Sequence, residues 1–157
     1  MSTEPDYLLQ AVRLGAESAA SGGGPFGAVV VTADGTAYPG NNEVTATFDP
    51  TAHAEVQALR AAARGLGTHD LSGSTLFTSC QPCPMCLTAA LWARVDRIVY
   101  AADQEDAARA GFDDSAFYRQ LERGLETVTF ARVDHRDIPE RLEPFEAWAA
   151  NSDRVEY

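Results

Sequence analysis

Three cysteines, Cys80, Cys83 and Cys86, lie in the stretch SCQPCPMC, and the chain contains no other cysteine. A cluster this tight fits no secreted disulfide framework, so the thiols are expected to be free, catalytic or bound to a metal. A metal would need a further ligand, and His53 in the stretch TAHAE is the candidate. The fold must then bring two segments that are distant in the sequence to one point.

Both segments are predicted to lie at the start of a helix. In a first helical turn the side chains tilt back toward the N-terminus, so His53 can reach a point beyond the helix end. Cys83 and Cys86 are three positions apart, which places both sulfur atoms on one side of the opening turn. Pro84 suits that turn, because its missing N–H has no helical partner to lose. Two helix N-termini that face one point also favour thiolate over thiol.

The predicted ligands, His53, Cys83 and Cys86, are one imidazole and two thiolates. Three protein ligands leave the fourth zinc position open, as in catalytic sites, whereas structural sites are closed by four. Zinc in such a site lowers the pKa of a bound water to about 7 and makes hydroxide available. Glu55 is the nearest carboxylate and is predicted to shuttle protons. His-x-Glu followed by Pro-Cys-x-x-Cys is a signature of zinc-dependent nucleobase deaminases, so one Zn²⁺ per chain is expected.

Each of these residues also has a simpler interpretation. Cys83 and Cys86 could form a thiol pair without a metal. Glu55 could serve only to stabilise the N-terminus of its helix. Cys80 is interpreted as a buried residue at the end of a strand. As a fourth ligand it would make the zinc site structural, and the interpretation as an enzyme would fail.

Apolar periodicity and turn residues divide the chain into helices and strands. Helices are predicted at residues 6–21, with Asp6 as the N-cap, and at 52–64, 84–94, 105–109, 115–123 and 145–151. Strands are predicted at residues 26–32, with a hairpin partner after residue 35, and at 76–78, 97–102 and 127–133. The alternation after residue 50 favours crossover connections. The predicted fold class is α/β, a three-layer α/β/α sandwich with a mixed central sheet, in one domain over residues 1–157.

The charge of the chain narrows the range of partners. Twelve Lys and Arg residues stand against 23 Asp and Glu residues, for a net charge of −11. A nucleic-acid partner is therefore disfavoured, and a small neutral or cationic substrate fits better. Glu4 and Asp6 lie where a secretory signal would carry basic residues. No apolar run approaches the roughly 20 residues that a membrane span requires, so a cytoplasmic protein is expected.

Longer stretches around the metal motif resemble bacterial guanine deaminases of the cytidine deaminase superfamily. The similarity extends from about Gly24 to Tyr157. It rests on the stretches GPFGAVVV, NNEVTATFDPTAHAEVQALR, TSCQPCPMCLTAALWAR, YAADQEDAARAGFDDSAFY and the ending EPFEAW…VEY. The resemblance implies the cytidine deaminase-like sandwich, with the zinc ligands and the proton shuttle named above.

The resemblance also implies residues that contact the substrate. Asn42 and Asp114 would hydrogen-bond the purine edge, and Phe26 and Trp92 would pack near the ring. A carboxamide and a carboxylate can together recognise a mixture of donors and acceptors. Phe26 and Trp92 could equally be core residues, and Asp114 could simply cap the helix that follows.

A homodimer is implied by the same resemblance, with the C-terminal segment of about 140–157 exchanged between chains. Tyr157 would then close the site of the partner chain. The expected activity is hydrolytic deamination of guanine to xanthine and ammonia by a zinc-bound hydroxide. Guanosine, cytosine, ammeline or tRNA adenosine are alternative substrates. A non-catalytic zinc-binding module is the alternative from another class.

Overall fold

The computed structural model describes residues 4–124 and 128–156. The chain falls into two compact units, Met1–Ser115 and Ala116–Tyr157, which we call the first and the second unit. The first unit contains the helices α1 (Glu4–Ala20), α2 (Val44–Thr47), α3 (Ala54–Leu66), α4 (Pro84–Trp92) and α5 (Gln104–Arg109). Its strands are β1 (Gly27–Val31), β2 (Ala37–Asn41), β3 (Thr75–Cys80) and β4 (Arg97–Ala102). Among the described residues, no helix is both long and apolar enough to cross a membrane.

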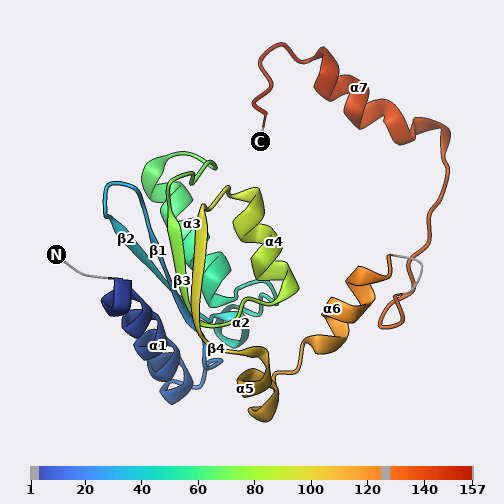
Figure 1. Ribbon diagram of the computed structural model, residues 1–157. Helices are drawn as coiled ribbons and strands as arrows, with labels where there is room; N and C mark the ends of the chain where they lie inside the picture. Colours follow the sequence, from blue (N-terminus) through green and yellow to red (C-terminus); the bar gives the residue numbers. More distant parts are fainter. Residues whose placement is uncertain (1–3, 125–127, 157) are drawn as a thin grey trace. The chain divides into compact units, whose positions relative to one another are not determined.

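The four strands form one sheet in the order β2-β1-β3-β4 (Figure 1). β1 runs antiparallel to β2 and β3, whereas β3 and β4 are parallel. β1 and β2 are joined by a short connection at residues 32–36, as the hairpin pattern predicts. A parallel pair needs a crossover connection, and α4 provides it between β3 and β4. The predicted mixed sheet is confirmed.

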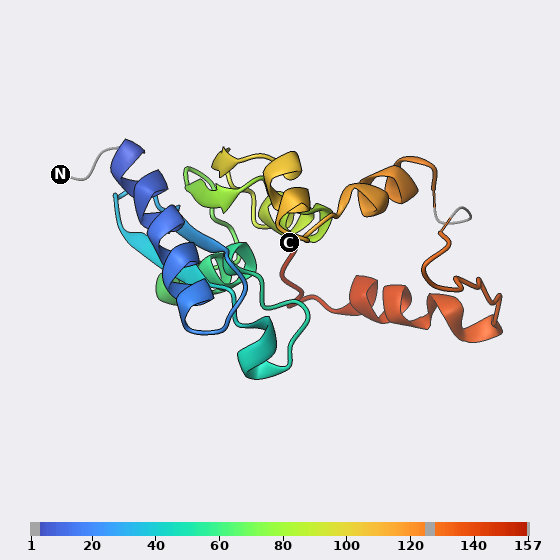
Figure 2. The same ribbon diagram turned by 90° about the horizontal axis from the view of Figure 1, so that it is seen from below.

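Helices cover both faces of the sheet, with α1 on one side and α3 and α4 on the other (Figures 1 and 2). Gly27 and Gly40 lie in adjacent cross-strand pairs of β1 and β2, so these two positions point to opposite faces. A Cβ atom at Gly27 would collide with the backbone of Ala11 in α1. A Cβ atom at Gly40 would collide with the backbone of Ala54 in α3. The absence of side chains thus lets both helices approach the sheet closely, and the three-layer sandwich is confirmed.

The main hydrophobic core lies between the sheet and the helices α3 and α4. Its buried members are small or aliphatic: Ala28, Val30, Ala54, Ala58, Leu59, Ala62, Leu71, Leu76 and Ala90. The alanines of α3 recur every four residues, which places them on one face of the helix. Removing such apolar surface from water is the main stabilising contribution to folding. This packing holds the starts of α3 and α4, where the predicted ligands lie, on the same side of the sheet.

The second unit contains most of α6 (Ser115–Glu122), the 3₁₀ helix η2 (Pro139–Leu142) and α7 (Glu143–Ala150). None of its described residues is buried, and every residue from 129 to 156 is exposed. The rings of Phe117 and Phe130 pack edge to face, with their centroids 5.4 Å apart. Within residues 116–124 and 128–156, the second unit therefore has local contacts but no hydrophobic core of its own.

Three predictions of local structure are wrong. Residues 128–133 form no strand, although the pattern predicts one from Thr127, which itself lies outside the described residues. The described part of the second unit contains no other strand with which they could pair. Asp6 lies inside α1 and does not cap it, because the helix already begins at Glu4. The short helix α2 lies in a segment where no helix was predicted.

Candidate metal centre and active site

His53 and Cys83 occupy equivalent positions on two helices. His53 is the N-cap of α3 and Cys83 is the N-cap of α4, both with extended backbone at φ −66°, ψ 152° and φ −67°, ψ 168°. Neither side chain makes a capping hydrogen bond, so both are available for other contacts. Pro84 begins α4, and Cys86 lies in its first turn. The predicted placement of both motifs at helix starts is confirmed.

The structure brings the three predicted ligands together. His53 Nδ1 lies 3.6 Å from Cys83 Sγ and 3.5 Å from Cys86 Sγ. All three ligand atoms lie within 4.8 Å of one another. Tetrahedral zinc, with bonds of about 2.0–2.3 Å to nitrogen and sulfur, places neighbouring ligand atoms about 3.5–3.8 Å apart. The spacing and the donor set therefore fit zinc, with three protein ligands.

The electrostatics of the three predicted ligands suit a metal site. Contact with Cys86, together with contact with His53, lowers the pKa of Cys83 to about 4, so the Cys83 sulfur is a thiolate. The same contact between the sulfurs raises the pKa of Cys86, which keeps the remaining proton. Contact with Cys83 raises the pKa of His53 despite its partial burial. A cation bound by these atoms would release the protons that they hold.

Glu55 is buried at the start of α3, with only 5% of its surface exposed. Burial raises the pKa of its carboxyl group, because the charged form is poorly solvated there. The hydroxyl of Thr78 in β3 donates to Glu55 Oε1 at 3.3 Å. A buried carboxylate with a raised pKa, beside a metal centre, is suited to accept and return a proton. Thr78 was not predicted, because its contact with Glu55 depends on how β3 lies against α3.

Cys80 does not join the metal group. Its thiol is buried at the end of β3 and donates to the carbonyl oxygen of Asp103 at 3.6 Å. Burial raises its pKa to about 11, so it remains a neutral thiol. This agrees with the interpretation of Cys80 as a strand-end residue, and it leaves the metal with three ligands among the described residues.

Asn42 and Phe26 lie side by side beyond the ends of two neighbouring strands. The backbone N–H of Asn42 donates to the carbonyl of Phe26 at 3.3 Å, and Asn42 Oδ1 accepts from Val44 N at 3.3 Å. The ring of Phe26 packs edge to face on Phe112, with the centroids 5.0 Å apart. Phe112 was not predicted as a site residue, although it lies in the quoted stretch AGFDDS two positions before Asp114.

Asp114 is half-buried and accepts a hydrogen bond from Gln104 Nε2 at 2.7 Å. After the contact with Cys83, the charges of Glu55 and Asp114 also raise the pKa of His53. Asp114 is therefore close enough to the metal ligands to influence them electrostatically. Gln104 was missed, because no spacing rule connects it to the metal motifs.

Trp92 is not brought to the sulfur atoms. It is the last residue of α4 and is 62% exposed. Cys86 and Cys83 lie toward the other end of this helix, about 9 Å and about 13.5 Å away along its axis at 1.5 Å per residue. Tyr157 lies outside the described residues. The substrate-contact roles of both residues stay predictions.

Comparison with known proteins supports the class of protein that the metal motif indicates, a zinc-dependent deaminase. Residues 1–102 match the family described as the cytidine and deoxycytidylate deaminase zinc-binding region. The chain belongs to this family of zinc-binding deaminases.

Among individual relatives, the chain is similar to guanine deaminase from Bacillus subtilis. The two are 46% identical over 154 residues, which cover 96% of this chain and 97% of the relative. The X-ray structure of the Bacillus subtilis protein superimposes with a TM-score of 0.94 at 45% identity, over 99% of both chains. The cytidine deaminase-like fold is thereby confirmed.

Two further relatives cover less of the chain. A structure of guanine deaminase from Nitrosomonas europaea matches with a TM-score of 0.68 at 34% identity, over 73% of this chain and 66% of the other. The tRNA-specific adenosine deaminase of Haemophilus influenzae is 36% identical over 121 residues, or 73% of this chain and 70% of that protein. Both of these matches are less extensive than the match to the Bacillus subtilis protein.

Proposed function

We propose that this chain is a zinc-dependent hydrolase that converts guanine to xanthine and ammonia. The observation that carries the proposal is the convergence of His53, Cys83 and Cys86 beside the buried carboxyl group of Glu55. Similarity to a guanine deaminase along 97% of that protein's length selects the substrate. The acidic composition of the chain agrees with a small, uncharged ligand.

The residues of the chain divide the reaction between them. His53, Cys83 and Cys86 hold the metal. Zinc held there with an open coordination position would lower the pKa of a bound water molecule to about 7. Glu55 would take one proton from the attacking water and deliver it to the ring nitrogen. It would then carry the second proton, from the new hydroxyl group on the ring carbon, to the amine, so that the C–N bond breaks and ammonia leaves. Thr78 holds Oε1 of that carboxyl group, so Oε2 is assigned to proton transfer.

Recognition of the base is assigned to Asn42, Asp114 and the aromatic residues. Guanine carries both N–H donors and acceptor atoms along its edge, which an amide and a carboxylate can bind together. Phe26, supported by Phe112, offers an apolar wall for a flat ring. Trp92 and Tyr157 complete the proposed set, Trp92 near the ring and Tyr157 as a lid that excludes water.

Ammonia release from a panel of substrates tests the proposal. Zinc-loaded protein is incubated with guanine, guanosine, cytosine, ammeline and tRNA, and ammonia is measured in each case. We expect guanine to give the highest kcat/KM. No release from any compound would indicate a non-catalytic zinc module, and preference for another compound would reassign the substrate. Deamination of tRNA would contradict the charge argument, since a net charge of −11 repels a polyanion.

We also propose that the chain forms a homodimer with exchanged C-terminal segments of about 140–157. The support is the exposure of the second unit, which buries none of its described residues. Its exposed apolar side chains include Phe117, Leu121, Phe130, Val133, Ile138, Leu142, Phe145, Trp148 and Val155. Chains rarely leave so much apolar surface in water unless a partner covers it.

Mixed dimers test the exchange. One chain carries Glu55→Gln and keeps its tail, and the other keeps Glu55 but ends at residue 139. Each is expected to be inactive alone, whereas co-expression restores guanine turnover, because the intact tail closes the intact site of its partner. Inactive mixed dimers would contradict the exchange. Tyr157→Ala in place of the truncation gives the same test with a smaller change, and sedimentation reports the oligomeric state.

The proposal further takes residues 1–157 as a single deaminase domain that works in the cytoplasm. Thiolate ligands such as Cys83 and Cys86 are kept reduced in that compartment. Cell fractionation with an antibody against the protein tests this location, and enrichment in an extracellular fraction would contradict it.

A further inference from the structure

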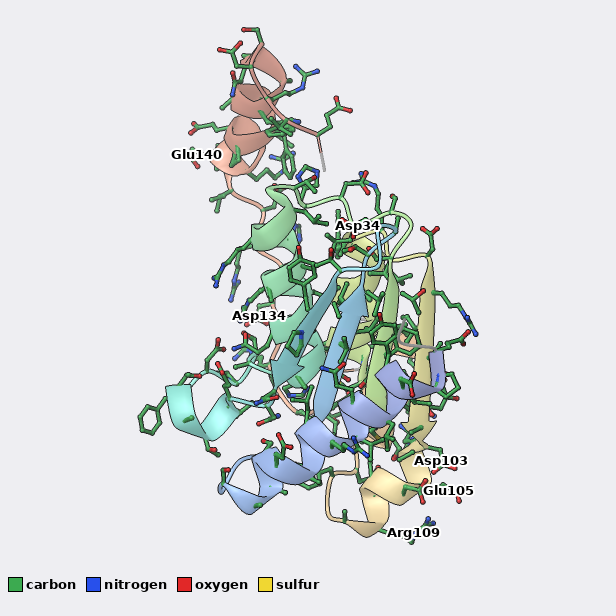
Figure 3. The ribbon with its side chains drawn as sticks, turned by 90° about the vertical axis from the view of Figure 1, so that its left-hand side faces the viewer. Asp34, Asp103, Glu105, Arg109, Asp134 and Glu140 are labelled. Atoms are coloured by element: carbon green, nitrogen blue, oxygen red, sulfur yellow. The ribbon has the colours of Figure 1, made fainter. Side chains whose placement is uncertain are left out.

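We propose that Gln104 is a positioning residue that orients the carboxylate of Asp114, and so determines how tightly the base is held. The inference rests on the proposed function and adds a residue to it. Gln104 is half-buried, whereas its neighbours Asp103 and Glu105 are exposed. Figure 3 shows these two neighbours at the start of α5, beyond the end of β4. The side chain of Gln104 is thus the one of the three that is turned into the protein.

The bond between the two side chains has a defined polarity. Gln104 Nε2 lies 2.7 Å from Asp114 Oδ1, and a carboxylate has no hydrogen to donate, so the amide must be the donor. Hydrogen bonds to a charged acceptor are stronger than those between neutral groups. The bond occupies Oδ1 of Asp114, and we assign Oδ2 to the substrate.

The backbone that carries Gln104 is itself well held. Asp103 and Asp106 form a capping box, in which Asp106 N donates to Asp103 Oδ1 at 2.9 Å and Asp103 N donates to Asp106 Oδ2 at 3.0 Å. Such reciprocal bonds satisfy two of the open donors at a helix start. Gln104 follows the N-cap directly, so its Cα position is fixed on both sides.

This helix start is also connected to the strand that leads into the metal loop. The thiol of Cys80 donates to the carbonyl oxygen of Asp103 at 3.6 Å, and Gln81 N donates to the carbonyl oxygen of Ala102 at 2.8 Å. Hydrogen bonds of Cys80 and Gln104 therefore connect the strand before the metal ligands, through the start of α5, to Asp114. Cys80 thereby acquires a structural role that its position three residues before Cys83 did not reveal.

The segment that carries Asp114 is also held in place at Phe112, two residues earlier. Phe112 N donates to the carbonyl oxygen of Ala107 at 2.9 Å, and the ring of Phe112 packs on Phe26. These contacts place the backbone of the segment but do not act on the Asp114 side chain itself. Gln104 supplies that last restraint, so its removal should weaken base binding without disturbing the metal.

Replacement of Gln104 with methionine tests the inference, because Met has nearly the same length and lacks the amide. We expect Gln104→Met to raise KM for guanine about tenfold. This is near the lower end of the effect of losing one hydrogen bond to a charged group, because Gln104 acts on the base only through Asp114. The value of kcat should change much less, and zinc content and thermal midpoint should stay as in the wild type. Gln10→Met on the exposed face of α1 is the matched control and should change nothing.

A double-mutant cycle shows whether Gln104 acts through Asp114. In an Asp114→Ala background, Gln104→Met should have no further effect. Where turnover is too slow to measure, the Kd of guanine is measured in the Glu55→Gln background instead. The inference would be overturned if Gln104→Met left the kinetics unchanged, or if it raised KM (or Kd) by the same factor with and without the Asp114 side chain. If Gln104→Met fails to fold, Gln104→Asn is used instead. Its side chain is one methylene shorter, so its amide cannot reach Asp114, and KM should rise by the same factor.

These outcomes separate the inference from the proposed function. A wild-type protein that releases no ammonia from guanine contradicts the function. A wild-type protein that is active, and that is matched by Gln104→Met in both KM and kcat, contradicts only the role of Gln104.

Discussion

The two units of this chain differ in how far their apolar side chains are buried. In the first unit, residues such as Val30 and Leu76 are fully buried between the sheet and its helices. In the second unit, Phe145 is 69% exposed and Trp148 is 40% exposed. A short segment cannot enclose a core by itself, because too much of its surface stays in contact with water.

The two units differ in their roles: the first contains the residues assigned to catalysis, whereas the second is proposed to close the site. All three metal ligands and Glu55 lie in the first unit, where the core holds the helix starts in place. The second unit contributes no member to this cluster among its described residues. A site of this kind can bind its metal with the first unit alone, whereas the proposed lid depends on a second chain. Changes in the two units should therefore have different consequences.

Removal of zinc should have the largest effect, and it should act on the first unit. We expect a chelator to abolish guanine turnover and to lower the thermal midpoint, because metal binding contributes directly to stability. Added zinc should restore both. Elemental analysis and ammonia release measure the outcome. Full activity in metal-free protein would contradict the assignment of His53, Cys83 and Cys86.

Glu55→Gln should have the next largest effect. It removes the proton carrier but keeps the shape of the buried side chain, so kcat should fall about 10²–10⁴-fold. Zinc content should be unchanged, because Glu55 is not a ligand. Glu105→Gln makes the same chemical change on the exposed surface of α5 and is the control. Loss of zinc from Glu55→Gln would show that the carboxylate has a structural role instead.

The metal centre could be predicted from the sequence because local rules determine it. An N-cap position, a proline in the first helical turn and a spacing of three residues are enough to aim Cys83 and Cys86. His53 could be assigned because it stands at a predicted helix start in a His-x-Glu pattern, which pairs with Pro-Cys-x-x-Cys in zinc-dependent deaminases. The alternation of helices and strands likewise identified the sandwich, since each element follows its own periodicity.

Contacts between distant side chains could not be predicted in the same way. The bond from Thr78 to Glu55 depends on how β3 lies against α3, and the bond from Gln104 to Asp114 depends on the turn after α5. The strand predicted to begin at Thr127 failed for a related reason. A strand forms only where a neighbour accepts its backbone hydrogen bonds, and periodicity contains no information about that neighbour.

In the first unit, Leu76→Ala should have a large effect on stability. Leu76 in β3 is 0% exposed, and truncation of a fully buried leucine costs about 2–5 kcal/mol of unfolding free energy. Urea unfolding of dilute protein measures the change, with Leu9→Ala on the half-exposed face of α1 as the control. A cost similar to that of the control would show that the sheet and its helices do not form the stabilising core.

Ionisation of Glu55 should have a smaller effect on the free energy of unfolding, and this effect should depend on pH. Burial raises its pKa above the unfolded value of 4.5, so the folded chain binds the proton more tightly. The group therefore stabilises the metal-free fold below that value, and this contribution is lost as pH rises through the folded pKa. Metal-free Glu55→Gln should be more stable than the wild type at about pH 8 and equal to it in acid. Urea unfolding at both values measures this, and a less stable variant at the higher pH would contradict it.

Phe145→Ala should have the smallest effect on folding, although it removes a larger side chain than Leu76→Ala does. Because Phe145 is 69% exposed in α7, its truncation should change the unfolding free energy of dilute, monomeric chain by less than about 0.5 kcal/mol. If an exchanged segment covers this ring, the same change should raise the dissociation constant of the dimer, which sedimentation measures. An unfolding cost close to that of Leu76→Ala in the monomer would mean that the second unit is stabilised within its own chain, and the contrast between the two units would be lost.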